Sequence, residues 1–396
     1  MKLKKLFAII LTIAMVFTLV AACAPANEPT PQEPETQAPE TPAPEVDDEV
    51  DTPPAIEAPD VDAEDRTHPD APITIGLPLV MTGTFAMFGE YALNGIQLAL
   101  EWEDRVDDFN LVLEDSQGNA EVVLTMLDLL THRDNARIVI GPCLGGEGLA
   151  AAQWAHDNPD VLLMPVYSAP QDITMRLFSE NIARAGFTGE QTTFDFGRFV
   201  AQEMGYSNIV IVGADYAFPW SQASGFIRGF LENGGESVER VWYPMGNLDF
   251  AGVMANLIEL SSNYEAVLIN DGGASVLAFL SAWEMFGMDA FYDRLLGATN
   301  ITFPFVLAEM PASFEGLVSA THYWHANPSP VNQQFVEMFM ERFGTWPSPV
   351  AVQGFDTMRV IIRALEALDW DYTDTAALVR EITNLTITDS PRGSFY

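Results

Sequence analysis

Short apolar runs rich in β-branched residues alternate with stretches of helical periodicity along this chain, and the alternation is completed twice. The expected strands are 73–80, 110–114, 137–141, 161–166, 208–213, 237–243, 266–270, 295–297 and 317–323. The clearest helical stretches are 91–105, 121–130, 190–204 and 275–286. Strands that alternate with helices predict parallel sheets with helical crossovers. The pattern therefore predicts an α/β protein with two doubly wound, Rossmann-like lobes and a ligand cleft between them.

Small and polar residues follow several of the expected strands. These segments are 81–84, 141–146, 167–169, 213–216 and 270–273. In open α/β sheets, ligands bind beyond the carboxyl ends of the strands, where free amides at helix N-termini favour anionic or polar groups. Any one of these loops could be a plain strand-to-helix turn. Five of them together predict a binding site in the cleft.

The start of the chain has the composition of a secretion signal. Lys2, Lys4 and Lys5 precede an uncharged apolar run over 6–22, which is short for a membrane span. Residues 20–23 resemble the bacterial lipobox, in which a signal peptidase cuts before a cysteine that is then acylated. We therefore expect a signal peptide over 1–22 and a lipid anchor at Cys23. An uncleaved N-terminal helix is the alternative, and it also leaves the protein outside the cytoplasmic membrane.

Residues 24–65 consist mainly of Pro, Glu, Asp, Thr and Ala, with almost no large apolar side chain. Such a segment cannot bury enough apolar surface to offset the loss of chain entropy. Its repeated proline steps and like charges favour extended conformations. We expect residues 23–70 to be a disordered acidic tether, and the folded body to begin near Ala71.

Charge and composition exclude several classes of function. With 18 Lys and Arg against 56 Asp and Glu, the formal net charge is -38, so the chain is unsuited to bind nucleic acid. No lysine follows Lys5, which removes the phosphate-loop lysine, the pyridoxal Schiff base and a lysine general base. Cys23 and Cys143 lie in contexts too different for a disulfide or a cysteine-rich metal site. Neither HExxH nor a GxSxG nucleophile elbow occurs, so we expect no cofactor and no catalysis.

Two alternatives concern single side chains. His322 and His325 have a spacing that could meet on one metal, although a strand or a turn would splay their rings. Cys143 follows an expected strand, where a helix N-terminus would favour a thiolate nucleophile. A small packing residue beside the ligand is the favoured interpretation of Cys143, and no metal site is expected.

Short segments along the folded body are similar, in order, to those of one family of binding proteins. They are 75–78, 81–83, 88–89, 94–95, 114–115, 118–119, 140–142, 165–168, 249–250 and 390–393. These segments follow a lipobox and an acidic tether, and together they resemble the extracytoplasmic solute-binding proteins of ABC importers. The family is that of the leucine/isoleucine/valine-binding protein, also called the type I periplasmic binding proteins. The resemblance covers essentially everything after Pro72.

The resemblance implies two lobes joined by a hinge of three chain crossings, which close on a small ligand. Crossings are expected near 187–188, near 320–322 and close to the C-terminus. The family's last short strand pair is missing after Tyr396, which indicates a truncated second lobe. The implied lobes are 71–187 plus 321–385 for the first, and 188–320 plus 386–396 for the second.

In the amino-acid-binding branch of the family, a serine helps to bind the ligand carboxylate and an acidic residue binds the ammonium group. The resemblance puts these positions on Gly145 and Thr299, while Ser168 keeps the hydroxyl of a third position. An unpaired buried charge costs on the order of several kcal/mol, so the loss of the acid argues against a zwitterionic amino acid. Asp271, at the end of its strand, is the alternative partner for an ammonium group.

Segment 215–219 is similar to the corresponding loop of the amide- and urea-binding branch. A neutral amide would be held by hydrogen bonds from Ser168, Asp271 and loop amides, between aromatic walls. The aromatic side chains could instead belong to the cores of the lobes. The expected ligand-binding residues are Phe88, Cys143, Leu144, Gly145, Gly146, Tyr167, Ser168, Phe218, Trp220, Asp271 and Thr299.

The sequence thus predicts a monomeric lipoprotein at the outer face of the bacterial cytoplasmic membrane. It would capture a small amino-acid-, amide- or urea-like solute by hinge closure and deliver it to the permease and ATPase complex of an ABC importer. A sensor with the same fold, which reports its ligand-bound state to a receptor, is the alternative. An enzyme is the third hypothesis, and a thiol hydrolase that uses Cys143 is its only concrete form.

Changing Cys23 to Ala should release the protein into the medium as a soluble monomer when the signal is still cut, because the acylated cysteine is the expected anchor. Fractionation of cells that express the wild type or Cys23→Ala measures this directly. If the cut variant stays with the membrane, the lipoprotein interpretation is wrong.

Overall fold

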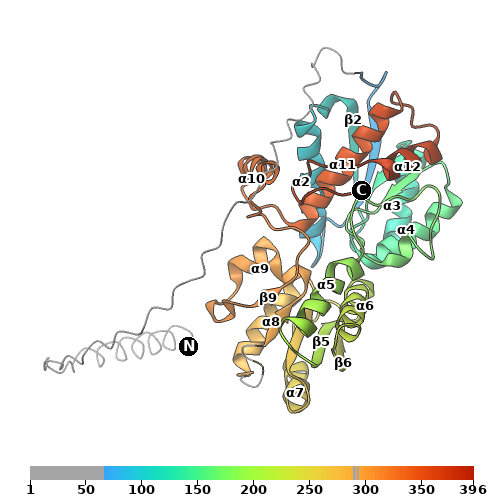
Figure 1. Ribbon diagram of the computed structural model, residues 1–396. Helices are drawn as coiled ribbons and strands as arrows, with labels where there is room; N and C mark the ends of the chain where they lie inside the picture. The colour runs from blue at the N-terminus through green and yellow to red at the C-terminus, as the bar shows by residue number, and fades with distance from the viewer. Residues whose placement is uncertain (1–66, 289–290, 292–293) are drawn as a thin grey trace, which may run out of the picture. The chain divides into compact units, whose positions relative to one another are not determined.

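Two parallel β-sheets organise the computed structural model of this chain, which describes residues 67–288, 291 and 294–396 (Figure 1). The first sheet has the strand order β2-β1-β3-β4, and the second has the order β6-β5-β7-β8-β9. The strands are β1 (Ile73–Leu79), β2 (Phe109–Asp115), β3 (Ile138–Ile140), β4 (Leu162–Met164), β5 (Asn208–Ala214), β6 (Ser237–Tyr243), β7 (Ala266–Asn270), β8 (Leu295–Gly297) and β9 (Val318–Ser319). The predicted signal peptide, Cys23 and the tether up to residue 66 lie outside the described residues.

Helices join successive strands and cover the sheets. With the first sheet lie α2 (Ala86–Trp102), α3 (Ala120–Asp128), α4 (Gly145–Asp157), α10 (Pro330–Phe343), α11 (Pro349–Ala367) and α12 (Thr375–Asn384). With the second lie α5 (Gly189–Gln202), α6 (Ala217–Leu231), α7 (Ala251–Leu260), α8 (Ala274–Met285) and α9 (Pro304–Glu309). Single turns are η2 (Val106–Asp108), η3 (Leu129–Arg133), η4 (Gln171–Ile173), η5 (Thr299–Thr302) and η6 (Ala312–Phe314). In the described part of the chain, no helix is long and apolar enough to cross a membrane.

The predicted two-lobed α/β class is confirmed, and a strand is present at each predicted position. All the paired strands are parallel. The strand predicted over 317–323 is much shorter in the structure, where only Val318–Ser319 pairs with β8. Beyond it the Thr321 hydroxyl donates to the carbonyl of Tyr323 at 2.9 Å, a local bond that favours a turn over a ladder.

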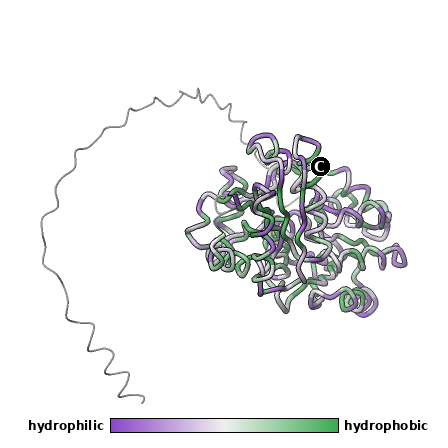
Figure 2. The backbone as a smooth tube through the Cα atoms, turned by 90° about the horizontal axis from the view of Figure 1, so that it is seen from below, coloured by the Kyte–Doolittle hydropathy of each residue, from purple (hydrophilic) through white to green (hydrophobic). Residues whose placement is uncertain are grey.

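The central strands are apolar on both faces because helices cover both sides of each sheet. In β1, Ile73, Ile75, Leu77 and Leu79 are all buried, and so are most of the residues between them. The edge strand β6 is more open: Glu239 and Arg240 are exposed, and only Tyr243 is buried. Figure 2 shows the hydrophobic residues gathered inside the folded body and the hydrophilic ones around it.

Helices α5 and α6 approach each other closely through glycines. A Cβ atom on Gly229 would lie 1.9 Å from the carbonyl oxygen of Phe194, and one on Gly225 would lie 2.3 Å from that of Glu190. These distances leave no room for a methyl group between the two backbones. The glycines therefore set the distance between α5 and α6. These two helices form one side of the region between the lobes.

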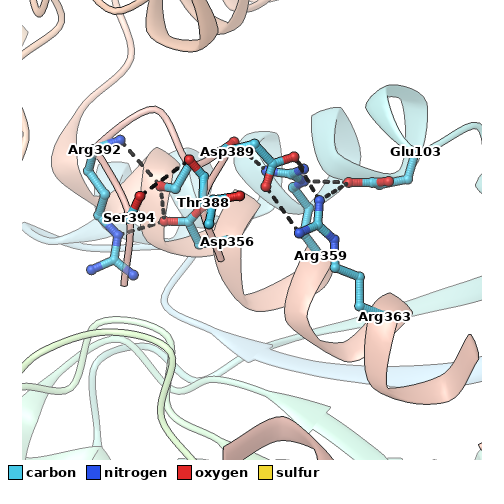
Figure 3. Close-up of polar contacts among 9 residues, drawn as sticks. Glu103, Asp356, Arg359, Arg363, Thr388, Asp389, Arg392 and Ser394 are labelled. Atoms are coloured by element: carbon cyan, nitrogen blue, oxygen red, sulfur yellow. Dashed lines mark hydrogen bonds and ion pairs between the residues drawn. The ribbon is translucent and has the colours of Figure 1, made fainter. Parts of the chain in front are cut away.

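The C-terminal segment 386–396 lies against α11. Asp389 accepts hydrogen bonds from Arg363 and Arg359, two arginines one helical turn apart (Figure 3). Burial raises the pKa of the Asp389 carboxyl, but the hydrogen bonds and charges of Arg363 and Arg359 outweigh it and lower that pKa to about 2. The segment is thus fixed to α11 by an ionised carboxylate.

Arg392 joins the same segment to the chain that leads out of the first lobe. Its Nε donates to Asp356 at 2.6 Å, and its Nη2 donates to the carbonyl of Ala185 at 2.6 Å. The guanidinium also lies 4.0 Å from the ring centroid of Phe395. The family resemblance implied that 386–396 belongs to the second lobe. The contact with Asp356 is made on α11, which packs on α2, and the buried Asp356 carboxylate needs the cation that Arg392 supplies. The third crossing and the lobe boundaries stay predictions.

Gly229→Ala should lower the free energy of unfolding by about 1–3 kcal/mol, since the methyl group must push α5 and α6 apart. Gly252→Ala in α7 is the matched control, because a Cβ there meets nothing within 4 Å. The control should be unchanged or gain up to about 1 kcal/mol, as Ala is the better helix former. Urea denaturation measures both. Equal stabilities would show that the close approach of α5 and α6 does not matter.

Candidate functional site

The loops at the carboxyl ends of the two sheets meet between the lobes. Tyr167, which follows β4, donates its hydroxyl to Oδ1 of Asn300 in η5 at 3.2 Å. Phe88 in α2 packs edge-on against Phe303, with 5.4 Å between the ring centroids. Each contact joins a first-lobe residue to a second-lobe residue. The strand-end loops of both lobes therefore form one junction.

Two small pockets lie side by side at this junction, and Tyr167 and Phe218 line both. The loop pocket is lined by Phe88, Cys143, Leu144, Gly145, Tyr167, Tyr216, Phe218 and Asn300. The hinge pocket is lined by Tyr167, Ala169, Phe187, Gly189, Thr192, Phe218, Gln222, Thr299, His322 and Gln353. Each has a volume of about 10 Å³, room for roughly one water molecule. A larger solute therefore needs the lobes or their side chains to move apart.

Stacked aromatic rings form the walls of the loop pocket. The ring of Tyr167 stacks on Phe88 at 5.9 Å and on Phe218 at 6.3 Å between centroids, and Tyr216 stacks on Phe218 at 6.4 Å. Phe88, Tyr167 and Phe218 are buried. Burial raises the pKa of Tyr167, so its phenol stays protonated and acts as a donor. These rings are core residues and pocket walls at the same time.

The hinge pocket contains an amide with a fixed orientation. Gln222 Nε2 donates to the hydroxyl oxygen of Thr299 at 2.7 Å and to that of Thr192 at 3.2 Å. Thr192 gives its own proton to the carbonyl of Gly189 at 2.7 Å, so it can only accept from Gln222. The remaining amide oxygen of Gln222, Oε1, is buried without a partner.

His322 lies on the other side of the hinge pocket as a neutral ring. Its Nε2 is 3.3 Å from Nε2 of Gln353, and its Nδ1 is buried without a partner. Burial, together with the charge of Arg392, lowers the pKa of His322 well below its ordinary value. Its ring packs against Phe187 with 3.7 Å between centroids. The described residues that line the two pockets therefore include no side chain that is charged at neutral pH.

The structure brings together most of the residues that the sequence predicts to bind a ligand. One or both pockets are lined by Phe88, Cys143, Leu144, Gly145, Tyr167, Phe218 and Thr299. Gly145 is the first residue of α4, and a Cβ there would lie 3.3 Å from the backbone nitrogen of Phe218. The position therefore suits glycine because the two lobes touch there.

Ser168 and Asp271 form hydrogen bonds within their own lobes and do not line the pockets. The Ser168 hydroxyl lies 2.9 Å from the carbonyl of Pro142 and 2.8 Å from that of Leu144, so its proton is used on the neighbouring loop. Asp271 accepts the hydroxyl of Tyr243 at 2.6 Å. Burial raises the pKa of Asp271 to about 6. Neither residue lines the two pockets, and Asp271 is directed toward β6 instead of an ammonium site.

Trp220 and Gly146 also lie outside the two pockets. The side chain of Trp220 is half-exposed, and its Nε1 donates to Asp215 at 3.1 Å. Gly146 is exposed, and a Cβ there would meet nothing within 4 Å. Gly146 lies in the first turn of α4, and Trp220 lies in the first turn of α6. In each case the opposite face of the helix is turned to the other lobe.

Neither of the two single-residue alternatives finds support. Burial, together with the nearby Glu147, raises the pKa of the Cys143 thiol well above its ordinary value, so a thiolate nucleophile is disfavoured. His325 packs against the rings of Trp324 and Trp346, away from the Phe187 side of His322. Among the described residues, no group of three or more His, Cys, Asp or Glu could hold a metal ion.

Gln222, His322 and Gln353 line the hinge pocket but are not among the ligand-binding residues that the sequence predicts. Gln222 lies four residues after Phe218, so helical spacing alone would have put it on the same face of α6. His322 stands at one of the crossings that the family resemblance implied, and Gln353 is in the middle of α11. No local signal marks Gln353, because only packing brings α11 to the crossing.

Comparison with known proteins identifies the family. A family model described as periplasmic binding protein matches residues 72–396. The chain belongs to the periplasmic binding protein family. The Leu/Ile/Val-binding protein homolog 6 of Brucella melitensis is 26% identical over 220 residues, which are 54% of this chain and 55% of that protein. The chain thus spans about half the length of the curated relatives that it matches.

Solved structures share the fold over most of the described chain. An ABC transporter substrate-binding protein from Sphaerobacter thermophilus is 28% identical, with a TM-score of 0.76 over 82% of this chain and 88% of that one. A solute-binding protein of R. palustris in complex with benzoate has a TM-score of 0.75 at 22% identity, over 82% and 89% of the two chains. The leucine binding protein LivK of Thermotoga maritima has a TM-score of 0.71 at 24% identity, over 81% and 90%. The predicted family is confirmed, and it is a family of binding proteins.

Glu147→Gln should make stability less dependent on pH. Glu147 is buried in the first turn of α4, and burial raises its pKa from the ordinary value of 4.5 to about 7. Between these values the folded protein keeps a proton that the unfolded chain releases, so wild-type stability falls as the pH rises through this window. Above pH 7 the variant should be the more stable by up to roughly 3 kcal/mol.

The measurement is the difference in unfolding free energy between wild type and variant from pH 4 to pH 8. Glu121→Gln removes an exposed carboxylate from the first turn of α3 and controls for the loss of charge at a helix N-terminus. A wild-type-minus-variant difference that does not change with pH would show that Glu147 has the same pKa in the folded protein as in the unfolded chain.

Proposed function

We propose that this protein is the solute-binding component of an ABC importer and that it captures a small, uncharged polar solute between its lobes. The observation that carries the proposal is the pair of pockets lined by neutral residues of both lobes. Family membership supports it, and the similar protein from Sphaerobacter thermophilus is described as an ABC transporter substrate-binding protein.

Hinge closure is the proposed mechanism. The lobes are held together here by weak contacts, such as the hydrogen bond from Tyr167 to Asn300 and the ring contact of Phe88 with Phe303. A solute that contacts both lobes adds binding free energy only when they are together, so it shifts the population toward the closed form. The permease and ATPase complex would then distinguish the closed form from the open one.

The location follows from the N-terminal sequence. A lipid on Cys23 and an acidic tether over 23–70 would hold the monomeric binding protein at the outer face of the cytoplasmic membrane. There it meets solutes from the surroundings and lies next to the permease. This part of the proposal rests on the sequence alone.

A neutral solute is favoured over a carboxylate. Two of the similar solved structures are named for benzoate and leucine, and both of those ligands carry a carboxylate. Here the partly buried Arg184 donates to the carbonyls of Ser168 at 2.6 Å and Pro170 at 3.0 Å, and Arg392 is paired with Asp356. The N-terminus of α4 at the loop pocket remains suited to a carbonyl oxygen. A carboxylate would therefore enter the pockets without a cation to pair with it.

A cognate solute should stabilise the protein without being consumed. A thermal-shift screen of acetamide, urea, benzamide, benzoate and leucine should find the neutral amides first, since a ligand at 100 times its Kd adds about 2.7 kcal/mol. The radius of gyration from small-angle scattering should fall on binding. Binding without contraction would contradict hinge closure. Micromolar leucine binding that Asp271→Asn abolishes would show that amino acids are the solutes after all.

Phe218→Ala should weaken the binding of that solute by roughly 1.5–3 kcal/mol, the value of one buried apolar side chain. Trp220→Ala is the matched control, because it removes an aromatic ring from the same turn of α6 but outside both pockets. Calorimetry on the two variants compares the two positions. Equal losses would place the solute elsewhere.

A further inference from the structure

The hinge pocket contains two buried hydrogen-bonding atoms without a partner, and they are of opposite kind. Gln222 Oε1 is an acceptor and His322 Nδ1 is a ring nitrogen. Gln222 is 1% exposed, so water at the protein surface does not reach its amide. A buried polar atom without a partner is destabilising, and a ligand that fits would supply the missing hydrogen bond.

The hydrogen bonds around Gln222 decide which end of its amide faces the pocket. The two threonine hydroxyls beside it, Thr192 and Thr299, accept from its nitrogen. Thr192 has already donated its proton to Gly189, so an amide oxygen in that place would face another oxygen without a proton between them. The amide oxygen is therefore the end left free.

The contacts of His322 decide where its proton lies. The ring is neutral, and Gln353 Nε2 is an amide nitrogen that can only donate. His322 Nε2 must then accept, which puts the ring proton on Nδ1. The other groups near the ring are Phe187 and Tyr167, which contact it with their own rings, and Arg392, which donates to Asp356 and to the carbonyl of Ala185. His322 thus presents a free N–H.

We propose that His322 Nδ1 and Gln222 Oε1 together recognise a primary carboxamide or ureido group of the solute. The solute's carbonyl oxygen accepts from His322, and its N–H donates to Gln222. This inference rests on the proposed function and names the chemical class of its solute. The rest of the solute extends past Tyr167 and Phe218, which line both pockets, toward the aromatic walls of the loop pocket.

Charged groups do not match this pair of atoms. A carboxylate can accept from His322 but then places its second oxygen against the Gln222 oxygen. An ammonium group can donate to Gln222 but meets the N–H of His322. Only a neutral group that carries a donor and an acceptor side by side satisfies both.

The test compares amides with acids of the same shape. Calorimetry with acetamide and benzamide against acetate and benzoate, and with urea, should show at least one amide or urea bound, and its acid analogue bound tenfold or more weakly. Gln222→Met and His322→Phe should each weaken the amide about tenfold, the value of one lost hydrogen bond. Both should also shrink the amide-to-acid ratio, which a merely structural defect would leave unchanged.

Two further variants distinguish the loss of a solute contact from a folding defect. His322→Gln retains a side-chain N–H donor and should bind the amide better than His322→Phe does. Gln334→Met, on an exposed position of α10, is the control for the Gln-to-Met change and should bind as the wild type does. Melting temperatures without solute establish that all variants are folded.

The outcomes separate this inference from the proposed function. If every amide and urea fails to bind, or if binding is unaffected by both Gln222→Met and His322→Phe, the inference is overturned. A bound water in place of a solute would give this result. Leucine or benzoate that binds with contraction of the protein would leave solute capture by hinge closure intact and overturn only the neutral solute, whereas no binding and no contraction would end both proposals.

Discussion

Parallel strand direction is the constraint on which the rest of this structure depends. Because all paired strands in each sheet run the same way, every strand-end loop of a lobe lies at one edge of its sheet. The two edges face each other, and residues as distant in sequence as Tyr167 and Asn300 come within hydrogen-bonding distance. The helical crossovers that parallel strands require then cover the sheets and make the central strands apolar throughout.

Avoidance of unpaired buried charge shapes what lies at that junction. Arg184 lies partly buried beside it, burial lowers its pKa to about 10, and its guanidinium donates to loop carbonyls. Asp271 is bonded to Tyr243, and Arg392 is paired with Asp356. The charges therefore stabilise the frame, and the pockets are left with aromatic rings, hydroxyls, amides and a neutral imidazole. Such a lining selects by hydrogen-bond direction instead of by charge.

The C-terminal segment connects this frame to the crossing. Arg392 bonds both Asp356 in α11 and the carbonyl of Ala185, and its charge helps to keep His322 neutral. One side chain thus fixes the end of the chain, orders the exit from the first lobe and preserves the N–H donor in the hinge pocket.

Sequence periodicity alone determined the two-lobed α/β fold, and short ordered resemblances determined the family, because the type of an element and its loop chemistry are local properties. The family resemblance also gave Phe88, Gly145, Phe218 and Thr299 as pocket positions, and the loop after a predicted strand gave Tyr167. The sequence patterns and the resemblance share one limit. They did not give the direction of a side chain. Ser168 and Asp271 are turned into their lobes, and Trp220 is turned to solvent. The place of segment 386–396 and the meeting of Gln222, His322 and Gln353 depend on packing between α6, α11 and a crossing far apart in the sequence. Only the tertiary structure decided them, since the partners of a buried polar group are set by which distant segments surround it.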